Sequence, residues 1–182
     1  MKGMIFTEFL DMVEEKFGYE TVDYIIKQAE DPEDGAYTSV STYDHKQLVQ
    51  LIVALHKKSG ISLRDLQLVY GRYLFGRLAI NYPRLLEGVT DPFDLLLNIE
   101  LMIHTEVRKL YPEANPPKFI GEKMDENSLN LIYHSHRSMG DVAEGLMLGC
   151  GDYFGVKFEI EQEVIDKDGH VVEFRITKVR SE

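Results

Sequence analysis

The hydrophobic pattern of the chain changes near residue 112, and this change limits the fold more than any other feature. Before it, apolar residues recur every three or four positions, as on one face of an α-helix. After it, "NSLNLIYHS", "VKFEIEQEVI" and "HVVEFRITKV" alternate apolar and polar residues, as strands do. The sequence therefore predicts an α+β fold, with about 110 residues of helices followed by an antiparallel sheet.

Start and stop signals divide the helical part into five segments. Gly18 and Gly60 follow two amphipathic stretches and suit the left-handed conformation that ends a helix. Ser62 with Asp65 three positions later is a variant capping box, and Asp91 before Pro92 marks the clearest helix start. We expect helices over residues 5–17, 20–30, 44–58, 62–82 and 91–110, the last of them continuous.

In the second part, the turn "DKDG" predicts a hairpin between the last two strands. A helix over residues 138–154 interrupts the sheet. Ser138 is its expected cap, and Asp141 completes a second variant capping box. We expect one domain in two lobes, a helical lobe over about residues 1–62 and a sheet-containing lobe over about residues 63–182.

Composition excludes several classes of protein. With 20 basic and 31 acidic residues, the net charge of −11 repels nucleic acid and anionic membranes. The only cysteine, Cys150, cannot form an internal disulfide, and its place on an apolar helix face indicates a core residue. The N-terminal segment carries four carboxylates by Glu15, unlike a signal peptide or membrane span. We expect a cytoplasmic protein.

Three hydrogen-bond donors alternate along the first predicted strand. Tyr133, Ser135 and Arg137 would share one face at a spacing of roughly 7 Å, which suits a flat ligand with two carboxylates at one edge. An ordinary solvent-facing strand end remains an alternative. His134 and His136 would share the other face, so a metal site or partner-binding module is a further alternative.

A histidine lies on the apolar stripe of the predicted 91–110 helix. His104 is in line with Leu97 and Leu101 on one side and Val107 on the other. It is either a core histidine with its hydrogen bonds satisfied or a metal ligand facing an apolar cavity. Apolar walls, one imidazole and a set of carboxylate-binding donors are together what a haem pocket requires.

With these residues in place, the chain resembles the H-NOX family, the haem nitric oxide/oxygen-binding domains, along essentially its whole length. The resemblance rests on the opening "MKGMIF", on His104, on Pro116 with Pro117, and on the signature Tyr-x-Ser-x-Arg at 133–137. The interval from His104 to the signature also matches. The family fold implies a haem buried between the two lobes.

The resemblance implies residue roles. His104 would be the proximal ligand to the iron of haem b, and Tyr133, Ser135 and Arg137 would hold the propionates. Pro117 matches the family proline that presses on the macrocycle, although "NPPK" would also make a rigid loop in any protein. Leu101, beside His104 on the stripe, is counted among the residues that contact the cofactor.

The distal side of the haem decides which gas binds. In oxygen-binding relatives, a tyrosine five positions beyond the signature arginine donates a hydrogen bond to the ligand, and here that position is Val142. Tyr73 would be an exception if its helix were rotated by one position. The other positions that match distal residues of the family are all apolar: Ile5, Phe9, Leu74, Leu78 and Leu146. We expect a sensor of nitric oxide and carbon monoxide that excludes oxygen.

The family resemblance also suggests how such a sensor signals. Release of His104 would free its helix and let the lobes shift. The output would belong to a separate partner, a histidine kinase or a cyclic-di-GMP enzyme. An oxygen-binding haem protein remains an alternative. We do not expect an enzyme, because the apolar distal set supplies no acid, base or polarising charge for peroxide cleavage.

Overall fold

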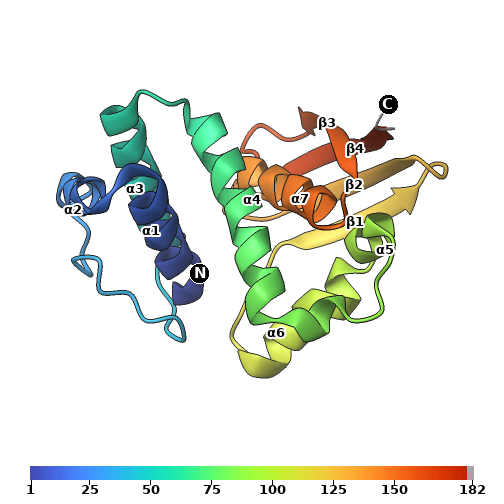
Figure 1. The fold of residues 1–182 in the computed structure, drawn as a ribbon, viewed down its shortest axis with the longest axis horizontal. Coiled ribbons are helices and arrows are strands. Elements are labelled where there is room, and N and C mark those ends of the chain that lie inside the picture. The colour runs from blue at the N-terminus through green and yellow to red at the C-terminus, as the bar shows by residue number, and fades with distance from the viewer. Residues whose placement is uncertain (180–182) are drawn as a thin grey trace.

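The computed structural model describes residues 1–179. Figure 1 shows helices that lead into an antiparallel sheet, so the predicted α+β class is confirmed. The helical segments are α1 (Gly3–Phe17), α2 (Tyr19–Gln28), α3 (His45–Ser59), α4 (Leu63–Asn81), the 3-10 turn η1 (Pro83–Leu86), α5 (Pro92–Leu97), the π-helical η2 (Glu100–His104), α6 (Thr105–Leu110) and α7 (Gly140–Tyr153). The strands are β1 (Lys118–Lys123), β2 (Ser128–His134), β3 (Lys157–Val164) and β4 (Val171–Val179).

The sheet has the order β1-β2-β4-β3, and all neighbouring strands are antiparallel. The predicted hairpin is the β3–β4 pair, and α7 crosses the inner face of the sheet (Figure 1). Strand β1 was not predicted. Its sequence "KFIGEK" lacks the apolar alternation because it is an edge strand with most side chains exposed.

Two hydrophobic clusters form the core, with α4 between them. One gathers side chains of α1, α2 and α3 with one side of α4, and the other gathers α5, α7 and the inner face of the sheet. Helix α4 lies directly against α7 because glycines face each other there. A Cβ on Gly145 would come within 2.4 Å of the Leu68 carbonyl oxygen, and one on Gly71 within 2.3 Å of the Val142 carbonyl oxygen.

Two of the three predicted N-terminal helix caps are present. The Ser62 side chain accepts from the backbone N–H of Asp65 at 3.0 Å, and that of Asp91 accepts from Phe93 at 2.8 Å. The predicted cap at Ser138 is wrong. Its hydroxyl instead donates to the carbonyl oxygen of Asp168 at 2.7 Å, and α7 begins two residues later at Gly140.

The expected continuous helix over residues 91–110 is also wrong. The chain forms α5, a π-helical turn and α6 in succession, and the Thr105 hydroxyl donates to the Glu100 carbonyl oxygen at 2.8 Å across the π turn. The wider turn rotates the following side chains. His104 is 9% exposed, whereas Leu101, expected beside it on the stripe, is 71% exposed.

Cys150 lies in the core under the sheet, where burial raises the pKa of its thiol to about 12. It is therefore a packing residue, as expected. In contrast, Tyr153 at the end of the same helix is largely exposed. Within residues 1–179 no helix is both long enough and apolar enough to cross a membrane.

Replacement of Gly145 by alanine should destabilise the fold by about 1–3 kcal/mol, because the added methyl group forces α4 and α7 apart. Gly76→Ala is the matched control in α4, where a Cβ would meet nothing within 4 Å. This control should gain about 0.5–1 kcal/mol from helix propensity. Urea unfolding of both variants measures the difference, and equal effects would contradict the close contact.

Candidate functional site

Strand β2 and the turn that follows it position the three signature residues. Tyr133 points to the inner face of the sheet, is 1% exposed, and accepts a hydrogen bond from the Met139 N–H at 3.2 Å. The expectation that all three share one strand face is wrong, because the strand ends at His134 and Arg137 lies in a turn. The turn still gathers them, since the Ser135 hydroxyl accepts from the Arg137 N–H at 3.2 Å.

Arg137 is partly buried and has no acidic partner within residues 1–179. Its guanidinium donates to the Asn115 carbonyl oxygen at 2.7 Å, and burial lowers its pKa. In contrast, Arg77 binds Glu8, Arg108 binds Glu100 and the more exposed Arg64 binds Glu144. A cation removed from water without a counterion is a binding site for an anion.

His104 presents a neutral imidazole with one uncommitted nitrogen. Its Nδ1 lies 2.8 Å from Oε1 of Glu100, and an ionised carboxylate can only accept, so the proton is on Nδ1. Burial lowers the pKa of His104, and Glu100 offsets only part of this shift. Nε2 therefore keeps its lone pair, and it has no hydrogen-bond partner in the part of the chain that the structure describes.

Strand β1 brings His104 and the signature into one site. The ring of Phe119 lies 6.1 Å from that of His104 and 5.6 Å from that of Tyr133, between centroids. The backbone N–H of Phe119 donates to Oε1 of Glu100 at 3.2 Å. Glu100 and Phe119 were missed by the sequence analysis, although the four-residue separation of Glu100 from His104 is a usable signal. Pro117, two residues before Phe119, is half-buried.

The residues expected on the distal side gather in a single apolar cluster. Phe9, Leu74 and Val142 are buried members of this cluster. The other three expected residues are partly buried and pack against it: Ile5, Leu78 and Leu146. The Tyr73 hydroxyl donates to Glu15 at 2.8 Å, so it points away from the cluster. The fully buried hydroxyl of Tyr70 donates to the Ile5 carbonyl oxygen.

Three other candidates from the sequence do not join the site: Leu101, His134 and His136. Leu101 is exposed, as described above. His136 leaves the strand and packs edge-on against His45, with ring centroids 5.8 Å apart. Among residues 1–179, the one group that places three metal-ligating side chains together is Asp166, Asp168 and His170, in the loop between β3 and β4. Neither His134 nor His136 belongs to it.

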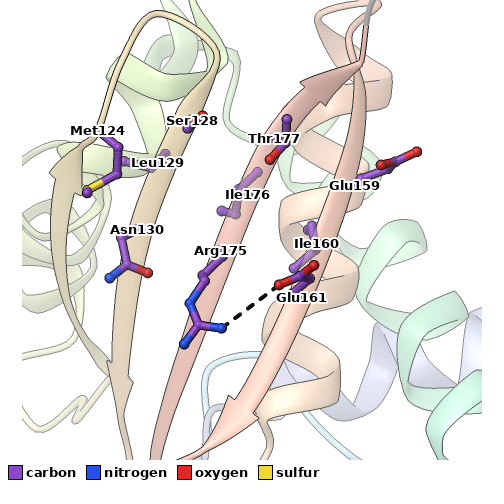
Figure 2. Close-up of a pocket in the computed structure, with 10 residues that line it drawn as sticks. All are labelled: Met124, Ser128, Leu129, Asn130, Glu159, Ile160, Glu161, Arg175, Ile176 and Thr177. Carbon is purple, nitrogen blue, oxygen red and sulfur yellow. Dashed lines mark ion pairs between the residues drawn. The ribbon is translucent and has the colours of Figure 1, made fainter.

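A hollow of about 620 Å³ lies on the outer face of the sheet (Figure 2). Charged side chains line it, and the Arg175 guanidinium there is already paired with Glu163 at 2.7 Å and with Glu161 at 3.9 Å. It contains none of the predicted site residues. The acidic side chains there neutralise Arg175, whereas no acidic side chain of residues 1–179 pairs with Arg137.

Comparison with known proteins identifies the family. The sequence model described as Haem-NO-binding matches residues 2–162. The chain belongs to the H-NOX family. Members of this family are haem-based gas sensor domains, so the cofactor class is haem.

Solved H-NOX structures match over nearly the whole chain. The Fe(II) unliganded protein from K. algicida is 44% identical, with 100% of this chain and 98% of that one covered and a TM-score of 0.92. The Fe(II)NO protein from S. oneidensis is 26% identical, with 99% and 100% covered and a TM-score of 0.90. The IWP-051-bound Fe(II)CO protein from Shewanella woodyi is 39% identical, with 98% and 95% covered and a TM-score of 0.83. No curated protein sequence gives a significant match.

Proposed function

We propose that this H-NOX chain binds haem b and acts as a sensor of nitric oxide and carbon monoxide. The observation that carries the proposal is that one site contains both a buried, neutral imidazole and a half-buried guanidinium with no acidic partner among residues 1–179. A haem needs both a nitrogen ligand for its iron and cations for its two carboxylates. The donor set of this chain therefore fits the group.

Each residue of the site then has a distinct task. Nε2 of His104 holds the metal, and Arg137, Ser135 and Tyr133 hold the carboxylates. Pro117 is rigid and lies between Asn115, which Arg137 binds, and Phe119, so it suits contact with the face of a flat ring. When bound, the haem supplies an iron position for a diatomic gas.

The selectivity proposal rests on the apolar cluster around Leu74 and Val142. Bound oxygen carries partial negative charge and needs a donor, whereas nitric oxide binds tightly without one. The hydroxyls of Tyr70 and Tyr73 are both engaged elsewhere. The six residues proposed for the distal side are all apolar and supply no acid or base for peroxide chemistry, so we propose a sensor and not an enzyme. The relatives from S. oneidensis and Shewanella woodyi were solved with nitric oxide and carbon monoxide.

For the output, we propose that release of His104 frees the segment from Glu100 to Leu110 and changes how the two hydrophobic clusters meet across α4. A separate histidine kinase or cyclic-di-GMP enzyme would detect this change. A reducing compartment such as the cytoplasm fits the buried thiol of Cys150.

The direct test of the proposal is His104→Ala. The variant should lose its bound haem, because no other imidazole replaces Nε2 in the site, and added imidazole should restore the haem spectrum. Absorption spectra of the purified ferrous protein measure both effects. A variant that keeps the wild-type spectrum would refute the assignment of His104.

Arg137→Leu should separate stability from haem binding. Without haem, the unfolding free energy should be unchanged or higher, since no acidic side chain of residues 1–179 pairs with this partly buried arginine. Haem affinity should fall about ten- to hundredfold with the lost charge-assisted hydrogen bonds. Arg72→Leu is the matched control, because Arg72 pairs with Asp152 on the surface at 2.7 Å. The control should retain haem, and equal haem loss in both variants would contradict the site.

Exposure of the ferrous protein to air tests the selectivity. No long-lived oxygen complex should form, because the apolar cluster offers no donor, while nitric oxide and carbon monoxide should each change the absorption spectrum. Tyr73→Phe and Tyr70→Phe should behave in the same way, since each hydroxyl already donates to a protein oxygen, Tyr73 to Glu15 and Tyr70 to the Ile5 carbonyl. A stable oxygen spectrum that one of these substitutions abolishes would identify the donor and overturn the proposal.

A further inference from the structure

We infer that Glu100 is a positioning residue that sets how strongly His104 holds the metal, and that Arg108 weakens this effect of Glu100. The inference rests on the proposed function, in which His104 is the ligand. It goes beyond that function by assigning the control of the bond to two residues outside the signature.

The carboxylate of Glu100 joins three separate groups. Its Oε1 accepts from Nδ1 of His104 at 2.8 Å and from the N–H of Phe119 at 3.2 Å, and its Oε2 accepts from the guanidinium of Arg108 at 3.1 Å. The carboxylate is thus shared between a metal ligand, a strand and a cation. All three of these groups donate to Glu100, so the carboxylate acts only as an acceptor in this network.

The chemistry of this contact is directional. A carboxylate that accepts from Nδ1–H raises the electron density on the imidazole and makes Nε2 a stronger ligand. Arg108 draws negative charge toward Oε2 and so weakens the acceptor that faces His104. Loss of Glu100 and loss of Arg108 should therefore change the metal bond in opposite directions. The proton stays on Nδ1 throughout.

The contact between Glu100 and His104 spans the π-helical turn. Glu100 begins the turn and His104 ends it, and the Thr105 hydroxyl bridges back to the Glu100 carbonyl oxygen. Because the same carboxylate binds the N–H of Phe119 in β1, the orientation of the imidazole is fixed relative to the sheet as well as to its own helix. A ligand held by two elements loses little further freedom when it binds a metal.

The test uses the full chain reconstituted with haem, in which resonance Raman spectroscopy reports the iron–histidine stretching frequency of the ferrous protein. Glu100→Gln should lower the frequency and speed haem transfer to an acceptor protein by about 10- to 100-fold. Arg108→Gln should raise the frequency and slow the transfer. The double variant should match Glu100→Gln, because Arg108 acts through the carboxylate.

Glu106→Gln is the matched control. Glu106 lies in the same segment and pairs with Lys109 at 2.6 Å, away from His104, so its removal should leave the frequency unchanged. Unchanged frequencies in both Glu100→Gln and Arg108→Gln, or shifts in the same direction, would overturn the inference. Arg108→Gln keeps Glu100 in place, so the test survives if Glu100→Gln fails to fold.

The two proposals fail in different ways. If His104→Ala keeps its haem spectrum, the proposed function itself is wrong. If the wild-type protein shows an iron–histidine band that neither substitution moves, His104 remains the ligand and only the assignment to Glu100 and Arg108 is wrong.

Discussion

The close packing of α4 against α7 is the contact on which the rest of the structure depends. Glycines at 71 and 145 let the two backbones approach, which no side chain with a Cβ would allow at that separation. One face of α4 then shares the N-terminal cluster with α1, and the other packs toward the sheet. Leu74 of α4 and Val142 of α7, which we propose for the distal wall, belong to the same apolar cluster beside this contact.

The N-terminal helices are held to α4 by polar as well as apolar contacts. Glu8 is buried in α1, and it is tolerated there because Arg77 of α4 binds it at 2.6 Å and Asn81 donates to it at 3.3 Å. Tyr70 adds a hydrogen bond to the Ile5 carbonyl oxygen. These contacts fix the register of α1, so that Ile5 and Phe9 face the cluster.

The sequence was most informative where a local interaction decides the structure. The caps at Ser62 and Asp91 depend on backbone groups two or three residues away, and both were predicted correctly. Ser138 was assigned wrongly because its hydroxyl bonds to Asp168, a tertiary contact that no local pattern contains. The π turn was missed for a related reason. An apolar stripe with helical period assumes uniform winding, and one wider turn moved Leu101 to the surface.

The candidate site depends on the segment from Asn115 to Phe119, which has no strong pattern of its own. Its start is bound by Arg137, at 2.7 Å, and its end by Glu100, at 3.2 Å. The segment therefore connects the residue proposed to hold the carboxylates with the one that orients the proposed metal ligand. The ring of Phe119 also packs against that of Tyr133. Displacement of His104 would therefore be transmitted to the signature strand through Glu100 and Phe119. Sequence patterns identified His104 and Arg137 as candidate site residues. Only the folded chain shows that the short segment from Asn115 to Phe119 connects them.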